Sequence, residues 1–442
     1  MLGAMTNSLD SPSRKQSFKL NGKVLTRTVV IDDQAILSKV RLTDPDKEDK
    51  ADLATWWRAY LKGARPKLSS KSSPLRTFDL FSGPGGLALG FRQAAEECGF
   101  SIESKAAIDV DKGALAVYKK NHKTLFTTFE SAKMLVNWQP LISRDSAKMF
   151  KPPTVLPILE QFVGKIDVVL AGPPCQGHSN LNNHTRRADE RNALYLIVPA
   201  MAIALEAPIV IIENVPGVLH DRQNVVKTTV SLLEEAGYHI EQGVHSASKM
   251  GWPQTRKRFF LIATKETTPL SIDSVAEALR VEHPFDIWWA IQEFANHKNV
   301  NFMDHLPDLS DTNVKRVKYL FEKNIHNLPN SERPDCHKNG NTYTAVYGRM
   351  HKDKPSPTLT GGFLSPGRGR FTHPTKPRVL TPREAARIQA FPDDYHFAAE
   401  EGVEPARTHL AKWIGDAVPM PLGYAAGLSA LMPRIASQKL SD

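Results

Sequence analysis

The sequence predicts an α/β fold in which a doubly wound, mostly parallel sheet carries a second, smaller, loop-rich domain. From residue 75 to residue 263, short apolar runs alternate with longer segments of helical periodicity. A glycine-rich turn follows the first run, and later runs end in polar residues. This alternation indicates a parallel sheet because a crossover helix must connect each strand to the next. After about residue 268 the alternation stops, and we expect loops and short strands there.

The composition is that of an ordinary globular protein of 442 residues, long enough for two domains. The formal net charge of +10 favours a polyanionic partner, although charge alone does not identify a nucleic acid. No apolar run approaches the roughly 18 residues of a membrane span, and we expect a cytoplasmic protein without membrane contact. Cys98, Cys175 and Cys336 are too widely spaced for a disulfide framework or a zinc site, so we expect no bound metal.

Residues 1–75 are expected to form an N-terminal extension and a linker. One short amphipathic helix is predicted over Ala54–Leu61, and a basic, serine-rich connector follows from Lys62 to Arg76. That composition is typical of a solvated tether. Contact of the connector with a phosphate backbone is the alternative interpretation.

The elements of the main domain are predicted from apolar runs and the residues that end them. Strands are expected at Leu75–Phe81, Ile102–Ile108, Ile166–Ala171, Pro208–Ile212 and Phe259–Ala263. Helices are expected at Leu87–Cys98, Gly113–Asn121, Ala193–Leu205 and Val225–Ala236. Residues 123–160 show no clear period and receive no assignment. In the second domain, Thr381-Pro382-Arg383-Glu384 predicts a helix start, since Thr381 can cap the helix and Glu384 can bond the cap amide.

The turn Gly83-Pro84-Gly85-Gly86 lies between a predicted strand and a predicted helix, where it would let a ligand approach the main chain closely. Asp109 closes the next strand, at the position where a ribose-binding carboxylate belongs. Read loosely, Gly83-x-Gly85-x-x-Ala88 also matches the dinucleotide fingerprint, so a nicotinamide cofactor is an alternative. A turn that serves only tight packing is another.

The strand that ends at Ala171 runs into Gly172-Pro173-Pro174-Cys175, which would place a thiol at the carboxyl end of a strand. The two prolines fix their φ angles and would hold the sulfur in place. Cys175 is therefore either a nucleophile or a small buried residue. Glu213 ends a neighbouring strand, and an acid beside a thiol would assist attack on an electron-poor ring. The alternative for Glu213 is a cap for the following loop.

Arg256 and Arg258 alternate on an extended segment and should share a face. Two guanidinium groups on one face suit a phosphate or a base oxygen. A solvated basic edge is the alternative and fits Lys257 between them better.

Six segments in this order resemble the cytosine-5 DNA methyltransferases of bacterial restriction-modification systems. They are Asp79–Gly86, Gly172–Gln176, Glu213–Val215, Gln254–Arg258, Arg378–Tyr395 and Gly415–Pro419. The family fold is the Rossmann-like, S-adenosylmethionine-dependent methyltransferase fold. The resemblance implies methyl transfer from S-adenosylmethionine to C5 of a cytosine that has left the base stack.

The resemblance also implies roles for single residues. Cys175 would attack C6 of the base, and Glu213 would engage N3 and the exocyclic amine. Arg258 would hold the base O2, with Arg256 near the catalytic loop. The residues that would line the cofactor pocket are Phe81, Gly83, Gly85, Asp109, Val110, Pro174, Leu194 and Asp416.

Two departures from the family pattern concern the cofactor. The last motif usually has Asn where this chain has Asp416. The third motif, which supplies an acid for the adenine, has no clear match, and Glu130 is the nearest acidic residue in a suitable position.

The expected partner is double-stranded DNA, bound by a monomer associated with the bacterial nucleoid. The residues expected to contact DNA are Gln176, Ser179, Arg186, Arg187, Arg368 and Arg370. We expect a catalytic domain over residues 76–270, completed by residues 412–442, and a target-recognition domain over residues 271–411.

Three alternatives stay open at this stage. A tRNA cytosine-5 methyltransferase shares most of the motifs. A DNA-binding module without activity would not need Cys175 and Glu213. A nicotinamide-dependent dehydrogenase would bind its cofactor at the same glycine-rich turn.

Overall fold

The computed structural model describes residues 15–43, 50–68, 72, 74–142, 147–174, 194–296, 300–338, 345–400 and 402–441. No described helix has both the length and the apolar character needed to cross a membrane.

A seven-stranded sheet forms the centre of the molecule, in the order β13-β14-β12-β11-β4-β5-β6. The strands are β4 (Pro74–Leu80), β5 (Ser101–Ile108), β6 (Phe126–Thr128), β11 (Val168–Ala171), β12 (Ile209–Asn214), β13 (His239–Ser246) and β14 (Lys257–Thr264). Neighbours from β12 to β6 are parallel, whereas β14 is antiparallel to both β12 and β13. The predicted α/β sheet is confirmed, but β13 was not predicted.

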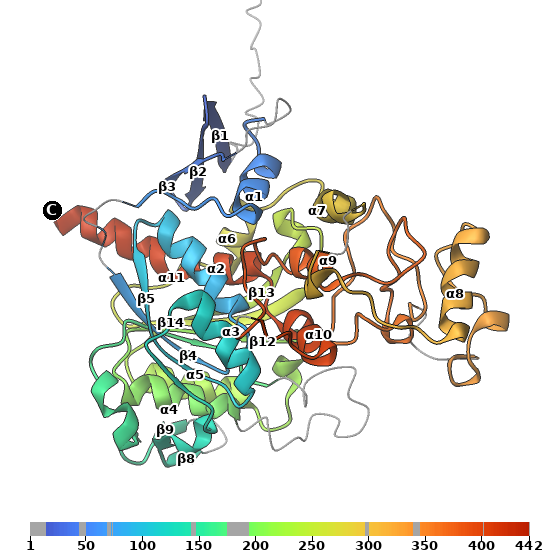
Figure 1. Cartoon of the computed structure of the whole chain (residues 1–442). Helices are drawn as coiled ribbons and strands as arrows, with labels where there is room; N and C mark the ends of the chain where they lie inside the picture. Colours follow the sequence, from blue (N-terminus) through green and yellow to red (C-terminus); the bar gives the residue numbers. More distant parts are fainter. Residues whose placement is uncertain are drawn as a thin grey trace, which may run out of the picture.

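Helices cover both faces of this sheet (Figure 1). One face carries α2 (Gly86–Glu97), α3 (Lys112–His122) and α11 (Met420–Ser441), and the other carries α4 (Ile197–Ala204) and α5 (Val225–Glu235). Alternate residues of the central strands enter the two apolar clusters: Ile209 and Ile211 face one, Val210 and Ile212 the other. This double burial explains why the central strands are uninterrupted apolar runs in the sequence.

Helices α2 and α11 approach through glycines. A Cβ on Gly90 would lie 2.7 Å from the main-chain nitrogen of Tyr424, and a Cβ on Gly423 would lie 2.9 Å from the carbonyl oxygen of Leu87. No side chain fits between the two helix backbones at this point. The last helix of the described chain therefore packs directly behind the glycine-rich turn, at the start of α2.

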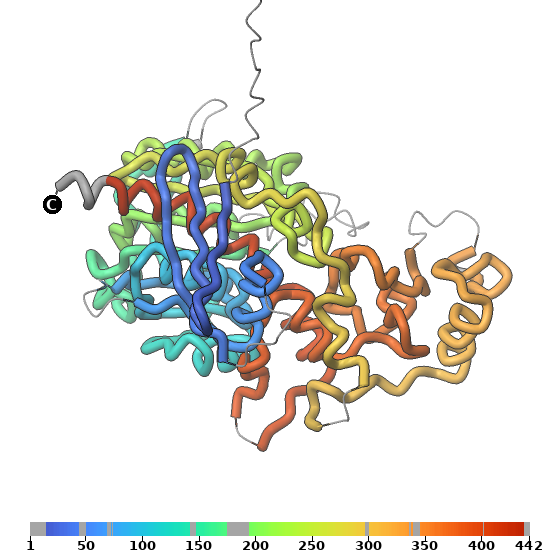
Figure 2. Tube along the Cα trace, turned by 90° about the horizontal axis from the view of Figure 1, so that it is seen from above, coloured from blue at the N-terminus to red at the C-terminus, as the bar shows by residue number. Residues whose placement is uncertain are grey.

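The N-terminal residues form a folded module that contains the predicted short helix together with three strands that were not predicted. An antiparallel meander of β1 (Gln16–Asn21), β2 (Val24–Ile31) and β3 (Gln34–Arg41) precedes α1 (Leu53–Leu61). Figure 2 shows the meander lying over the body formed by the seven-stranded sheet and its helices. The strands were missed because Arg27 occupies an inward position of β2 and interrupts the apolar alternation, although its side chain is fully buried.

The segment left unassigned in the sequence contains short elements only. They are η1 (Ala132–Met134), β7 (Val136–Asn137), β8 (Pro140–Ile142), β9 (Ala147–Met149), β10 (Thr154–Val155) and η2 (Pro157–Phe162). Strand β7 pairs with β10 and β8 pairs with β9, each antiparallel. Strands this short carry no detectable period.

Between the sheet and α11 the described chain is helical and irregular. The helices are α6 (Ile272–Ala278), α7 (Ile287–Ile291), α8 (Asp311–Glu322), α9 (Pro382–Ile388) and α10 (Arg407–Asp416). The short strands predicted here are wrong for the described residues, which form isolated bridges such as Arg349 with Thr372. Helix α8 lies at the end of a projection away from the sheet (Figures 1 and 2).

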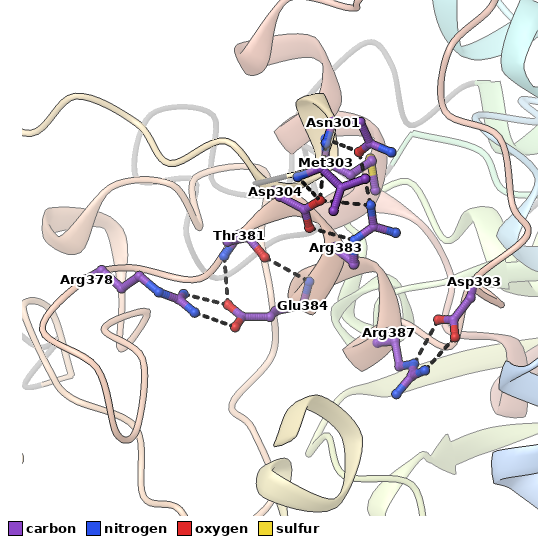
Figure 3. A network of polar contacts seen from close by, with 10 residues as sticks. Asn301, Met303, Asp304, Arg378, Thr381, Arg383, Glu384, Arg387 and Asp393 are labelled. Carbon is purple, nitrogen blue, oxygen red and sulfur yellow. Dashed lines mark hydrogen bonds and ion pairs between the residues drawn. The ribbon is translucent and has the colours of Figure 1, made fainter. Parts of the chain in front are cut away.

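Helix α9 is fixed by ion pairs and by the predicted capping box (Figure 3). The Glu384 carboxylate accepts two hydrogen bonds from Arg378, at 2.8 and 2.7 Å, and one from the cap amide of Thr381. Arg387 pairs with Asp393 through two hydrogen bonds of 2.9 and 2.5 Å. The helix is therefore tied on both sides to the segments that precede and follow it.

Candidate active site

The carboxyl ends of β4, β5, β11 and β12 lie at one edge of the sheet because these strands are parallel neighbours. In open α/β sheets this edge is where ligands bind. Phe81–Gly85, Asp109, Gly172–Pro174 and Glu213 therefore meet at a common site.

The catalytic loop is described as far as Pro174. The expected nucleophile Cys175 and the expected DNA contacts Gln176, Ser179, Arg186 and Arg187 lie outside the described residues. The start of the loop is held by Asn214, whose side-chain amide donates to the carbonyl of Pro173 at 3.2 Å. This bond fixes the segment after β11, at Pro173, to the end of β12, next to Glu213.

Glu213 is 7% exposed and forms an ion pair with Arg258, with 2.6 Å between Oε1 and Nε. Its other oxygen faces the catalytic loop, since a Cβ on Gly172 would lie 3.6 Å from Oε2. Burial raises the pKa of Glu213, and the charges of Arg258 and Arg256 oppose that rise without cancelling it. The site thus favours a carboxyl group that holds its proton to a higher pH than an exposed glutamate.

Arg256 and Arg258 both lie inside the protein, so the alternative of a solvated basic edge is wrong for them. Arg256 donates to the carbonyl oxygens of Leu359 and Gly415, at 2.6 and 2.8 Å, and to that of Asp416 at 3.2 Å. It therefore joins the start of β14 to two segments of the C-terminal half. Lys257, between the two arginines, is exposed.

The glycine-rich turn has an ordered main chain. Phe81 adopts a left-handed conformation with φ of 56°, which costs a non-glycine residue about 1 kcal/mol or more. The Asp109 carboxylate accepts from the amides of Gly83 and Asp111, both at 2.8 Å. Each carboxylate oxygen has a second lone pair, so Asp109 can order the turn and still accept from the hydroxyls of a ribose.

Two exposed apolar side chains lie beside Asp109. Val110 is 70% exposed, and Phe129, just beyond β6, is 51% exposed. The segments are adjacent because the Asp109 amide bonds the carbonyl of Thr128. Exposed apolar groups at a ligand-binding edge suit a flat base such as adenine. Phe129 was missed because β6 has only three residues; Glu130, the acid suggested for the third motif, follows it and is exposed.

Asp416 ends α10 and pairs with Lys412, with 2.8 Å between Nζ and Oδ2. Burial lowers the pKa of Lys412, but the carboxylates of Asp416, Asp111 and Asp109 outweigh it and raise that pKa. Lys412 therefore lies near Asp109 and Asp416, the two acidic residues that are expected to line the cofactor pocket. It offsets the charge that Asp416 adds where the family has a neutral Asn.

The remaining predicted residues differ in their surroundings. Pro174 and Leu194 are partly buried, and Leu194 packs against the apolar cluster on the α4 face. Arg368 is exposed. Arg370 is partly buried and donates to the carbonyls of His326 and Arg349, at 2.8 and 3.0 Å, and to the side chain of Asn327. Among the described residues, no group of three or more His, Cys, Asp or Glu side chains could hold a metal ion.

Comparison with known proteins places the chain in a family. The model of the C-5 cytosine-specific DNA methylases matches residues 75–430. The chain belongs to this family. The predicted family, fold class and enzyme class, a DNA cytosine-5 methyltransferase, are confirmed, and the dehydrogenase alternative is wrong.

Relatives of the methylase match most of its length. The Type II methyltransferase M1.BsuMI of Bacillus subtilis (strain 168) is 37% identical over 423 residues, which cover 94% of this chain and 95% of that protein. The Type II methylase M.HgiDII of Herpetosiphon aurantiacus is 28% identical over 358 residues, 78% of this chain and 92% of that protein. The first alignment covers more of the chain than residues 75–430 and so includes part of the N-terminal module.

Solved structures show the same fold. The S. pombe Dnmt2 methyltransferase has a TM-score of 0.52 and 16% sequence identity, with 80% of this chain and 98% of that chain covered.

Proposed function

We propose that this methylase is the modification enzyme of a Type II restriction-modification system, acting on one cytosine within a specific duplex sequence. The observation that carries the proposal is the buried Glu213–Arg258 pair beside Gly172–Pro174, at the carboxyl edge of the sheet. The Type II methyltransferases of Bacillus subtilis and Herpetosiphon aurantiacus, which match most of the chain, support the biological setting.

The proposed reaction begins with the Cys175 thiolate, which attacks C6 of a cytosine that has been flipped out of the duplex. Attack breaks the C5–C6 double bond and moves its electron pair towards C5. Glu213 donates a hydrogen bond or a proton to N3, which makes the ring more electron-poor at C6. A base in the stack offers neither ring face, so flipping must precede attack.

The surroundings of Glu213 support its part as the acid. A buried carboxyl with a raised pKa keeps its proton to a higher pH than an exposed one, which favours a donor to N3. Arg258 Nε pairs with Oε1 of Glu213, whereas Oε2 lies towards Gly172. We expect Arg258 also to hold the base O2, while Arg256 keeps the surrounding segments in place.

We propose that S-adenosylmethionine, which supplies the methyl group when bound, occupies the site at the glycine-rich turn. The residues present fit it: Asp109 has lone pairs for the ribose, and Val110 and Phe129 are exposed apolar partners for the adenine. Phe81, Gly83, Gly85, Pro174, Leu194 and Asp416 would complete the pocket. Once the methyl group is on C5, with S-adenosylhomocysteine as the leaving group, a base must take the C5 proton so that its electron pair re-forms the C5–C6 double bond and expels the Cys175 thiolate.

We further propose that residues 76–270 and 412–442 form the catalytic domain and residues 271–411 the target-recognition domain. The protein would act as a monomer on double-stranded DNA in the bacterial cytoplasm, at the nucleoid. The formal charge of +10 supports a polyanionic partner.

The test is methyl transfer from radiolabelled S-adenosylmethionine to plasmid DNA, with tRNA as the competing substrate. Labelled DNA and unlabelled tRNA are expected, and bisulfite sequencing of the product locates the cytosine. Cys175→Ala should abolish transfer. Labelled tRNA with unlabelled DNA would overturn the proposal in favour of the RNA alternative.

A further inference from the structure

The glycine-rich turn is supported by His122, at the end of α3, and by Tyr395. Gly85 has φ of +99° and lies so close to α3 that a Cβ would collide with the His122 imidazole and lie 2.8 Å from the Tyr395 hydroxyl. The Tyr395 hydroxyl donates to the carbonyl oxygen of Pro84. His122 Nε2 lies 3.2 Å from the same hydroxyl.

The three groups form a directed chain of hydrogen bonds. Because the hydroxyl proton of Tyr395 goes to the Pro84 carbonyl, its oxygen is left to accept from His122 Nε2–H. His122 is 4% exposed and stacks on Tyr118 with 4.3 Å between ring centroids. Burial and the nearby charge of Arg92 lower the pKa of His122, and a hydrogen bond with the Gly85 main chain opposes that shift without cancelling it, so the imidazole is neutral and contacts both Tyr395 and the turn.

Tyr395 is itself held in place. Its ring packs between Phe391 and Phe397, with centroids at 4.7 and 5.4 Å. Two residues earlier, Asp393 is fixed by Arg387 of α9 (Figure 3) and donates its amide to the carbonyl of Leu61 in α1. A tyrosine anchored by its ring and by its own segment can fix the main chain that its hydroxyl reaches.

We propose that Tyr395, supported by His122, is a positioning residue that holds the Pro84–Gly85 main chain in the conformation that accepts the methionine end of the cofactor. The inference rests on the proposed function, since it requires S-adenosylmethionine to bind at this turn. Tyr395 belongs to the segment assigned to target recognition, so residues 76–270 alone would lack a support of their own cofactor turn.

Two other tyrosines provide matched controls. Tyr60 donates to the carbonyl of Ala390 at 3.2 Å, and Tyr238 donates to the carbonyl of Ala207, and both are buried. Their carbonyl partners lie outside the turn. Each control loses the same kind of bond as Tyr395→Phe and keeps its ring.

The experiment compares wild type, Tyr395→Phe, Tyr60→Phe and Tyr238→Phe by calorimetric titration with S-adenosylmethionine and by steady-state kinetics. Tyr395→Phe should weaken cofactor binding and raise the KM for the cofactor roughly 3- to 10-fold, as the loss of one hydrogen bond predicts. Its kcat and its KM for DNA should stay within about twofold of wild type, and the controls should bind the cofactor normally. His122→Phe, which keeps a ring against Tyr118, should give a similar loss that does not add to that of Tyr395→Phe.

The outcomes separate the two proposals. Wild-type protein that does not bind S-adenosylmethionine would refute the proposed function. Normal wild-type binding with unchanged affinity in Tyr395→Phe would refute only the positioning role. Equal losses of affinity in Tyr395→Phe and Tyr238→Phe would also refute it, since Tyr238 is remote from the segment that carries Tyr395 and the effect would then be general destabilisation.

Discussion

The carboxyl group of Glu213 and the guanidinium of Arg258 lie 2.6 Å apart on two antiparallel strands, β12 and β14, almost closed to solvent. A buried pair of this kind is held in one geometry by both strands. In the proposed function Glu213 has two roles: its ion pair with Arg258 stabilises the fold, and its proton assists catalysis.

Glu213→Gln should remove catalysis while leaving DNA binding close to normal. The amide keeps the shape of the side chain but supplies no acid, and the expected loss in kcat is about 10²- to 10⁴-fold. Single-turnover methylation of plasmid DNA and filter binding measure the two quantities. Glu241→Gln, outside the site, should retain full activity. A Glu213→Gln enzyme with wild-type kcat would show that Glu213 is not the acid.

The pH dependence of the same reaction should report the raised pKa of Glu213. A carboxyl with a raised pKa keeps its proton in the range between its ordinary and its raised value and loses it as the pH increases further. The pH profile of kcat/KM should therefore fall on its alkaline side with an apparent pKa above that of an exposed glutamate. Glu213→Gln should lose this limb, and a limb that persists in the variant belongs to another group.

Glu384 should make the protein sensitive to acid. Burial alone would raise the pKa of Glu384, but hydrogen bonds from Arg378 and His373 lower it to about 2. A lowered pKa stabilises the fold above the unfolded-state value of about 4.5, and the contribution is lost as the pH falls towards 2. Urea unfolding between pH 6 and pH 3, measured by circular dichroism, should show a stability loss of about 2 kcal/mol from this group. Glu384→Gln should lose stability at pH 6 and show a flatter acid dependence.

Arg27 of the N-terminal module should be essential to the stability of the catalytic body. Its guanidinium lies 3.5 Å from the Glu97 carboxylate of α2 and bonds the Tyr424 hydroxyl of α11, and both charges are buried. Arg27→Met leaves Glu97 buried without its cation, which should cost about 3–5 kcal/mol. The double variant Arg27→Met/Glu97→Leu should recover part of that loss. Urea unfolding of wild type, Arg27→Met and the double variant measures these changes in stability. An unchanged urea midpoint in Arg27→Met would contradict the prediction.

Gly90→Ala should destabilise the protein, although alanine is the better helix former. At an open helix position this substitution stabilises by up to about 1 kcal/mol. Here the added methyl meets the backbone of α11, and we expect a net loss of about 1–3 kcal/mol. A lower thermal midpoint in Gly90→Ala would show that the collision with α11 prevails, and a higher one that the helix propensity of alanine prevails.

The sequence revealed the parts of this enzyme that are local. Strands β11 and β12 are buried on both faces, so their apolar runs are unmistakable, and the Thr381 capping box lies within four consecutive residues. Strand β13 escaped because, at the edge of the sheet, only Ile240 and Val244 of its eight residues are apolar. The meander of the N-terminal module escaped because Arg27 faces inward.

The supports of the site could not be predicted because they join distant residues. Tyr395 and Pro84 are 311 positions apart, and Arg256 bonds carbonyl groups 103 and 159 positions away. Every residue has a main-chain carbonyl, so a bond to one leaves no pattern of residue types in the sequence. The candidate residues of the site could thus be proposed from their side chains, whereas the long-range hydrogen bonds that orient them could not be predicted.

The close packing of Gly90 against Gly423 has a consequence for synthesis on the ribosome. Helix α2 emerges early, yet the surface that covers it is made more than three hundred residues later, together with the Tyr424 partner of Arg27. Until that segment leaves the ribosome, the nascent chain exposes the apolar face behind its cofactor turn. Long-range closure of this kind is slow and exposes the incomplete chain to aggregation and proteolysis. A shortened translation product would therefore be degraded rather than accumulate as a partly active methylase.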